Sequence, residues 1–325
     1  MTIKYILSNF PLRLIISDYC NLNCFFCSNE GLPLSQKNKT HASIESLKFL
    51  INVLVKNGLK NIALTGGEPS TYPPIKDLIR FINKFPFEQK FFHTNGILLG
   101  ENLINGLLEN FTKIAISVHA FEPTLWQKIT GGSLLQYEMV LKNLFLLRKR
   151  GLSSKVEIKH VVIKGFNDSK EIIKKTIDFC AENNFKFKFL NFEPIRKEQI
   201  GLAIPIEKMR KKLEQLGCEP LPLDSFFRGQ SSYLPLIWYR YKNIKGVLIE
   251  IGCGESWACE SCYLSNEIVV TPFLEIKPCH MSNIYIPLAS LIKNKDEEGI
   301  LDAVRKSREI LKEKPGLNKS YWNQS

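Results

Sequence analysis

Six short runs of β-branched and aromatic residues alternate along the chain with segments whose apolar residues recur at helical spacing. Such alternation predicts a parallel sheet covered by helices, with ligands gathered where the strands end. Six units make an incomplete (β/α)6 barrel with an open side. The predicted strands are Leu12 to Ile16, Asn61 to Leu64, Lys90 to His93, Lys113 to Val118, Val156 to Ile163 and Lys186 to Phe192.

The segments between these strands carry helix signals. Ile44 to Val55 keeps its apolar residues on one face and is followed by Asn57-Gly58, a helix stop. Asp168 is a residue type that caps helix N-termini. We expect further helices at Ile75 to Phe85, Gln136 to Lys149 and Asp168 to Asn183.

Length and composition place the chain in a broad class. Its 325 residues, 44% of them hydrophobic, suffice for one large core, or for a large and a smaller one. No apolar run reaches the roughly 18 residues of a membrane span, and the first residues lack a secretory signal, so we expect a cytoplasmic protein without a membrane partner. The net charge of +12 comes with lysines spread over the whole chain, which does not favour nucleic acid as a partner.

The pattern changes after Pro194. A helical segment near Ile206 to Leu216 is followed by cysteine-rich sequence, in which Ile268 to Thr271 and Leu274 to Ile276 predict two short strands. We therefore expect an α/β protein of two domains. Residues 1–198 form the partial (β/α)6 TIM-like barrel, and residues 199–325 form a smaller C-terminal domain that needs metal or the barrel for support.

Cys20, Cys24 and Cys27 directly follow the first predicted strand. Three thiolates this close on one loop can hold three irons of a 4Fe-4S cluster and leave the fourth iron open for chemistry. A zinc site and plain buried cysteines are the alternatives. Because zinc usually takes four ligands from two separated pairs, and no His or fourth Cys lies close in sequence, we favour the iron-sulfur cluster.

The spacing C-x3-C-x2-C, with the aromatic Phe26 before the last cysteine, resembles the radical S-adenosylmethionine superfamily. This resemblance implies that Cys20, Cys24 and Cys27 hold a 4Fe-4S cluster. It also implies that the open iron takes the amino and carboxylate groups of S-adenosylmethionine, and that Phe26 contacts the adenine. Taken alone, Phe26 is equally well explained by core packing.

A second motif, Thr65-Gly66-Gly67-Glu68-Pro69, ends the second predicted strand and resembles the superfamily's GGE motif. There the glycines let the backbone approach the ligand, and the glutamate accepts a hydrogen bond from its ammonium group. Gly-Gly-Glu alone is a common turn, but its place at a strand end after the three cysteines makes it specific. The same resemblance assigns cofactor contacts to Gly66, Gly67, Glu68, Thr94, Asn95, Ser117, Ile163 and Glu193.

A second group of cysteines lies in the C-terminal part of the chain. Cys259 and Cys262 form a CxxC pair, with Cys253 before it and Cys279 after it. The two predicted short strands would fold Cys279 back beside the pair. We interpret the four thiols as ligands of a second, auxiliary 4Fe-4S cluster. A structural zinc ribbon is the alternative, since the spacing also suits zinc.

The sequence from Arg13 to Cys279 resembles the GTP 3',8-cyclase family. That family binds an auxiliary cluster through three cysteines, matched here by Cys259, Cys262 and Cys279, and uses its open iron to hold GTP. Arg13 matches an arginine that binds substrate in that family. The extra thiol of Cys253 would close the cluster and leave it to conduct electrons or to shape the pocket.

Several cations of the GTP 3',8-cyclase family are missing from this chain. Ala63 stands where the family has a basic residue, Glu157 aligns with a lysine of the fifth strand, and Tyr263 to Glu267 replaces an Arg-x-Arg-x-Arg run. Each charge-assisted hydrogen bond to a triphosphate is worth roughly 1.5 to 3 kcal/mol. We therefore do not expect GTP to be the substrate.

These features predict a radical S-adenosylmethionine enzyme, which makes a 5'-deoxyadenosyl radical and takes hydrogen from a small molecule of a biosynthetic pathway. Because 19 residues precede Cys20, we expect no leader-peptide-binding domain. A peptide-modifying maturase, a GTP 3',8-cyclase and a non-enzymatic metal-binding protein are the alternatives.

The predicted cofactors are S-adenosylmethionine, the 4Fe-4S cluster that binds it, and the auxiliary 4Fe-4S cluster. The predicted partners are a small-molecule substrate, for which an anion is compatible, and an electron donor such as flavodoxin or ferredoxin. Candidate substrate residues near the barrel mouth are Arg13, His119, Lys159 and Arg196, each of which a surface or packing role would also explain.

Overall fold

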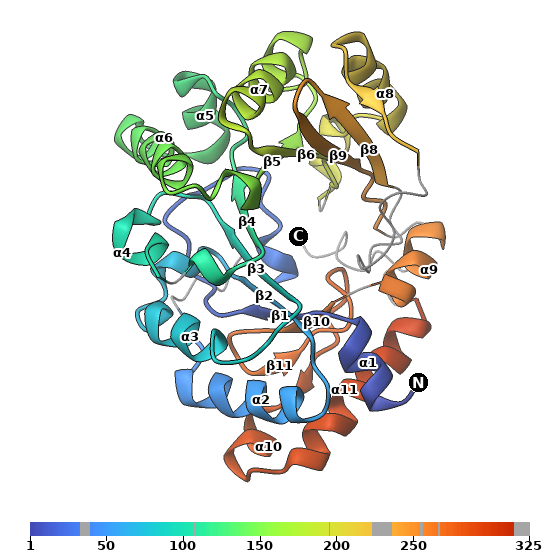
Figure 1. Cartoon of the computed structure of the whole chain (residues 1–325). Helices are drawn as coiled ribbons and strands as arrows, with labels where there is room; N and C mark the ends of the chain where they lie inside the picture. The colour runs from blue at the N-terminus through green and yellow to red at the C-terminus, as the bar shows by residue number, and fades with distance from the viewer. Residues whose placement is uncertain are drawn as a thin grey trace.

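The computed structural model describes residues 1–32, 40–106, 108–194, 196–222, 236–253, 256–265 and 267–314. All six predicted strands are present, and each begins and ends within one residue of its expected bounds. They lie side by side and parallel in chain order, which confirms the barrel topology (Figure 1). The strands are β1 (Leu12–Ile15), β2 (Asn61–Thr65), β3 (Gln89–Thr94), β4 (Lys113–Ser117), β5 (Val156–Val162) and β6 (Lys186–Asn191).

Helices cover the outer side of these strands, as predicted (Figure 1). Helix α2 begins after Ser43, whose hydroxyl accepts a hydrogen bond from the backbone N–H of Ser46. The predicted cap at Asp168 is wrong, because α7 starts later and Ser169 caps it. The outer helices are α2 (Ile44–Lys56), α3 (Ile75–Ile82), α4 (Gly100–Ile104), α5 (Pro123–Thr130), α6 (Leu134–Lys149) and α7 (Lys170–Asn183).

Strands from the C-terminal part of the chain extend both edges of the barrel sheet. Strand β10 (Ile268–Val270) pairs in parallel with β1, and β9 (Ile244–Ile249) pairs in parallel with β6. The predicted hairpin is confirmed, since β11 (Glu275–Ile276) runs antiparallel to β10. The outermost strands are β12 (Ile286–Pro287) on one edge, and β8 (Leu236–Tyr241) and β7 (Glu219–Pro220) on the other. The boundary between residues 198 and 199 stays a prediction.

The remaining helices lie mostly in the C-terminal part of the chain. The last of them, α11 (Glu297–Lys312), contacts α1, α2 and α9 and so ties the two ends of the described chain together. None of the helices in the described ranges is both long and apolar enough to span a membrane. The others are α1 (Ile3–Asn9), α8 (Ile206–Gln215), α9 (Ser256–Ser265) and α10 (Ala289–Lys293).

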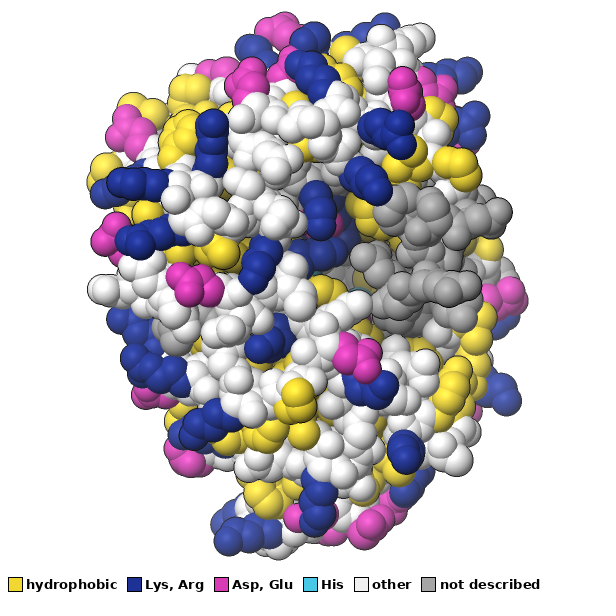
Figure 2. Space-filling model, in the orientation of Figure 1, with side chains coloured by type: hydrophobic (Ala, Val, Ile, Leu, Met, Phe, Trp, Pro, Cys, Tyr) yellow, Lys and Arg dark blue, Asp and Glu magenta, His cyan; other side chains and the backbone are white. Residues whose placement is uncertain are grey.

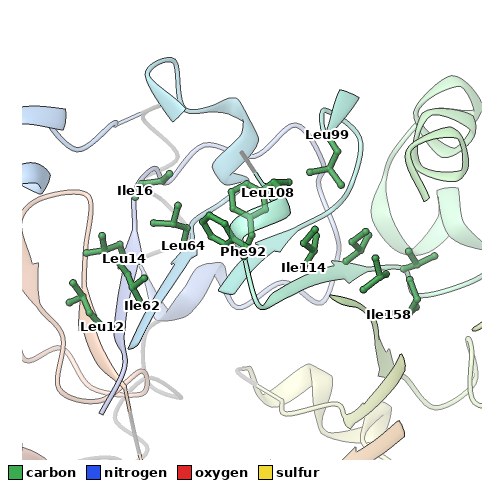
Figure 3. Packing of buried hydrophobic residues seen from close by; sticks show 14 of the residues in the cluster. Leu12, Leu14, Ile16, Ile62, Leu64, Phe92, Leu99, Leu108, Ile114 and Ile158 are labelled. Carbon is green, nitrogen blue, oxygen red and sulfur yellow. The ribbon is translucent and has the colours of Figure 1, made fainter. Parts of the chain in front are cut away.

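The two sides of the barrel strands differ in character. Side chains that point outward are apolar and fully buried against the helices, as Figure 3 shows for Leu14, Leu64, Phe92 and Ile158. Successive residues of a strand alternate between the two faces. The neighbours of these residues therefore face the inner side of the sheet, which we call the lumen, and several of them are charged.

Candidate active site and second cysteine centre

The loop that carries Cys20, Cys24 and Cys27 leaves β1 at its carboxyl end. Backbone N–H groups of Leu22 and Asn29 donate to the sulfur atoms of Cys20 and Cys27, at 3.4 and 3.3 Å. Burial, together with the nearby charges of Glu68 and Cys27, raises the pKa of Cys20 to about 12. A thiol in this position ionises readily only when a cation such as iron binds it, which suits the donor set of a cluster.

The Gly66-Gly67-Glu68 turn packs directly on the cysteine loop. The backbone N–H of Gly67 donates to the carbonyl of Ser17 at 2.8 Å, and that of Glu68 donates to the carbonyl of Tyr19 at 2.8 Å. A Cβ at Gly67 would lie 2.3 Å from the Tyr19 oxygen, so no other residue fits there. In the structure the glycines thus let the backbone approach the cysteine loop.

The carboxylate of Glu68 is buried and held by several donors at once. It accepts hydrogen bonds from the Ser70 hydroxyl at 2.6 Å, the Thr94 hydroxyl at 2.7 Å and the Asn95 backbone N–H at 2.6 Å. Burial raises its pKa despite these bonds. The Asn95 amide reaches Asn21 in the cysteine loop at 2.7 Å. The predicted cofactor residues of β2 and β3 therefore form one hydrogen-bonded unit beside Cys20.

The ring of Phe26, in the cysteine loop, contacts the ring of His119, which follows β4. Their ring centroids lie 4.8 Å apart, edge to face. Burial lowers the pKa of His119 to about 3, and its Nδ1 accepts a hydrogen bond from the Val161 backbone at 3.2 Å. The imidazole is therefore neutral, with its proton on Nε2. The Asn167 side chain accepts a hydrogen bond from the Ile163 N–H at 2.7 Å and donates one to the His119 carbonyl at 2.9 Å. These bonds hold the segments after β4 and β5 together.

The other predicted residues near the mouth are spread around it. Arg196 donates to the Phe25 carbonyl in the cysteine loop at 3.4 Å. Ser117 ends β4, and Lys159 lies beside it in the register of β5. Glu193 follows β6, and its charge adds to the rise that burial causes in the pKa of Cys253. Its predicted cofactor contact stays a prediction.

Arg13 points into the lumen but is already paired with two carboxylates. It makes a bidentate contact with Glu30 at 2.9 and 3.0 Å and a third bond to Glu267 at 3.0 Å. Although burial opposes ionisation of Glu30, Arg13 lowers its pKa to about 2. Glu30 follows the cysteine loop and Glu267 precedes β10, so Arg13 joins these two segments.

The four cysteines of the C-terminal part come from three separate segments of the chain. Cys259 and Cys262 lie one turn apart on α9, Cys253 follows β9, and Cys279 follows β11. Burial raises the pKa of Cys253, and the charges of Cys262, Cys279 and Cys259 each raise it further. Each of the other three thiols thus acts electrostatically on Cys253, and the auxiliary centre itself stays a prediction.

Two buried cations stand beside these thiols. Arg308 of α11 stacks on Phe10, 3.8 Å from the ring centroid. Burial raises the pKa of Cys262 to about 12, and the charge of Arg308 partly opposes this rise. Lys277 is 1% exposed, and its charge partly opposes the rise that burial causes in the pKa of Cys279. Arg308 also donates to the Tyr263 carbonyl, and Lys277 donates to the Ser282 carbonyl and to the Tyr285 hydroxyl. A site with buried positive charge and four thiols fits a metal centre held by thiolates.

A short contact connects the two cysteine groups. His280 follows Cys279, and its Nδ1 lies 3.1 Å from the backbone carbonyl of Glu30. Because a carbonyl only accepts, His280 carries its proton on Nδ1.

Across the described ranges, no three His, Cys, Asp or Glu side chains gather closely enough to chelate a single metal ion.

Sequence analysis missed several of these residues. Glu30, His280, Lys277 and Arg308 were not among the predicted site residues, nor was Lys188, which lies in register with Lys159 on β6. The signal for Lys188 was present, because Lys and Phe alternate in Lys186-Phe187-Lys188-Phe189 and so separate a charged face from an apolar one. The others reach their places through contacts between distant parts of the chain, which no local pattern reveals.

Comparisons with known proteins agree with this geometry. The sequence profile of the Radical SAM superfamily matches residues 14–180. A GTP 3',8-cyclase of Clostridium perfringens is 30% identical over 93% of this chain and 88% of its own length. A probable GTP 3',8-cyclase of Pyrobaculum aerophilum is 26% identical over 93% of this chain and 94% of its own. Streptococcus suis SuiB, solved with S-adenosylmethionine, shares the fold at a TM-score of 0.63 and 18% identity, over 93% of this chain and 69% of SuiB.

Proposed function

Because the chain belongs to the radical SAM superfamily, and is therefore an S-adenosylmethionine-dependent enzyme, we propose that it abstracts hydrogen from a small-molecule substrate. When bound, the iron-sulfur cluster and S-adenosylmethionine supply a 5'-deoxyadenosyl radical for this step. The observation that carries the proposal is the joined unit of the three-cysteine loop and the Gly66-Gly67-Glu68 turn at the carboxyl ends of β1 and β2.

We assign the work of the protein to groups around this unit. Cys20, Cys24 and Cys27 would hold the cluster. Glu68, fixed by Thr94 and the Asn95 backbone, would accept a hydrogen bond from the ammonium group of S-adenosylmethionine. Three further side chains would exclude water and position the adenine: Phe26, His119 and Ile163.

GTP fits this lumen poorly, although sequence relatives carry the name GTP 3',8-cyclase. Arg13 is neutralised by Glu30 and Glu267. Glu157, which stands where that family has a lysine, adds a buried negative charge, and it pairs with Lys113 at 3.2 Å. A triphosphate would have to displace or overcome these carboxylates, so a substrate with less negative charge is favoured.

The second cysteine group supports a separate proposal, an auxiliary 4Fe-4S cluster bound by Cys253, Cys259, Cys262 and Cys279. Four interacting thiols and the two cations Arg308 and Lys277 speak for it. With four protein ligands such a cluster has no open iron, so we propose electron transfer or pocket shaping as its role. A flavodoxin- or ferredoxin-like protein would deliver the electron that S-adenosylmethionine cleavage consumes.

The function is tested by anaerobic reconstitution, reduction with dithionite and chromatographic detection of 5'-deoxyadenosine. The wild-type protein should form it from S-adenosylmethionine, and Cys24→Ala should reduce its formation to background. Cys218→Ala is the matched control, because it removes a buried thiol that belongs to neither group. Absence of 5'-deoxyadenosine from reduced, iron-loaded wild type would contradict the proposal.

A further inference from the structure

Three polar side chains form a row across neighbouring strands of the lumen. Ser117 of β4 lies in register with Lys159 of β5, which in turn lies in register with Lys188 of β6. Ile116 and Ile158, next to two of them, are fully buried on the outer face. By strand alternation the row therefore faces the lumen. Two residues beyond Ser117, His119 contacts Phe26, so the row lies beside the cysteine loop.

The other charges near this row are already paired. Arg13 binds two carboxylates, and Glu157 lies 3.2 Å from Lys113 and 3.9 Å from Lys188. The ammonium group of Lys159 differs, since it makes no hydrogen bond or ion pair with any residue in the described ranges. We call the charged side chains that act electrostatically on Lys159 and Lys188, together with these two lysines, the lumen group. Its cations are Arg13, Lys113, Lys159 and Lys188, and its carboxylates are Glu30, Glu157 and Glu267.

Counted without the exposed Lys186, which lies on the same face of β6, the lumen group carries one more positive charge than negative. Burial lowers the pKa of His93, so this histidine adds no charge. Burial, Lys188 and Arg13 lower the pKa of Lys159 to about 8, so most of it is still protonated at pH 7. An ammonium without a partner in a half-buried site is costly and attracts an anion. Figure 2 shows Lys and Arg side chains grouped at a depression near the middle of one face.

We propose that the row of Ser117, Lys159 and Lys188 binds one carboxylate group of the substrate. A carboxylate brings the single negative charge that the lumen group lacks, and its two oxygens can accept from two ammonium groups and a hydroxyl. A triphosphate carries several negative charges, which exceed the one excess positive charge of the lumen group. The inference rests on the proposed function, because it names the class of substrate that the same site takes.

Protection of Lys159 from acetylation tests this inference on the full-length, iron-loaded protein. A limiting amount of an N-hydroxysuccinimide ester of acetic acid is added anaerobically, and peptide mass spectrometry follows each lysine. The probes are sodium propionate, sodium phosphate, GTP and sodium chloride at equal ionic strength. Propionate should protect Lys159 saturably, by about tenfold at concentrations well above its dissociation constant. Lys149, exposed on α6, is the internal control.

A second variant keeps the result specific to the row. Lys188→Gln should weaken the protection of Lys159 by propionate about tenfold, the effect of losing one charge-assisted hydrogen bond. Lys149→Gln should leave that protection unchanged. The inference is overturned if chloride, phosphate or GTP protects Lys159 as well as propionate does, if Lys149 is protected equally, or if Lys188→Gln changes nothing.

Formation of 5'-deoxyadenosine by the same wild-type preparation distinguishes failure of the carboxylate site from failure of the proposed function. If it forms and propionate gives no protection, the carboxylate site is wrong and the proposed function stands. If it does not form, the proposed function is wrong, whatever the acetylation shows.

Discussion

The two cysteine groups both offer sulfur ligands, but they differ in the number of thiols and in the charges beside them. Cys20, Cys24 and Cys27 offer three thiols on one loop, and Cys27 is exposed. The second group offers four thiols from three separate segments, with Arg308 and Lys277 beside them. A group of three leaves an iron for a ligand, whereas a group of four closes the cluster and makes its surroundings control its potential. The comparison teaches that the count of thiols, and the charge near them, separate a reacting centre from an auxiliary one.

The sharpest way to break this comparison is to remove one thiol from each group. Cys24→Ala should abolish 5'-deoxyadenosine formation, because it destroys the centre that binds S-adenosylmethionine. Cys253→Ala should still form 5'-deoxyadenosine while it changes the electron paramagnetic resonance signal of the second cluster. If Cys253→Ala abolishes cleavage as completely as Cys24→Ala, the two groups do not have separate roles.

The next largest effect is expected at Glu68. Glu68→Gln removes a buried charge that four donors hold in place, so the binding of S-adenosylmethionine should weaken about tenfold to a hundredfold. Calorimetric titration of the iron-loaded protein measures this change. Glu88→Gln, at an exposed ion pair with Lys60, is the control and should bind normally. Unchanged binding by Glu68→Gln would remove this residue from the first centre.

Glu30 contacts the C-terminal part of the chain through its backbone carbonyl, which faces His280, and its carboxylate binds Arg13. Arg13 holds the pKa of Glu30 at about 2, below the 4.5 of an ordinary glutamate. This ion pair therefore stabilises the fold fully above pH 4.5 and less as the pH falls towards 2. Glu30→Gln should lower the free energy of unfolding by about 2 kcal/mol at pH 7. Urea unfolding of the metal-free protein at several pH values should show the difference from wild type shrinking below pH 4.5.

The smallest expected effect concerns the charge beside the second group. Arg308→Gln removes a buried cation near Cys262, so the reduction potential of the second cluster should fall, by on the order of 50 mV. Arg305→Gln, on the same helix but more exposed and paired with Asp302, should shift it far less. A potentiometric titration followed by electron paramagnetic resonance compares them, and equal shifts would contradict a local role for Arg308.

Local patterns predicted the barrel strands and the cysteine loop well, because both depend on short segments. Alternation of apolar residues and the spacing of Cys20, Cys24 and Cys27 need no distant partner. The lumen could not be predicted in the same way. Arg13 meets Glu267 across most of the chain, and Arg308 reaches Cys262 from the last helix. Such contacts depend on how the sheet curves and on how α11 packs, which spacing does not encode.

The most direct test of the account is a Mössbauer spectrum of protein reconstituted with iron-57, recorded with and without S-adenosylmethionine. The account predicts about eight irons per chain, one of which changes its signal when S-adenosylmethionine binds. That change should vanish in Cys24→Ala and persist in Cys253→Ala. A spectrum that S-adenosylmethionine does not alter, or a change that follows Cys253 instead of Cys24, would contradict it.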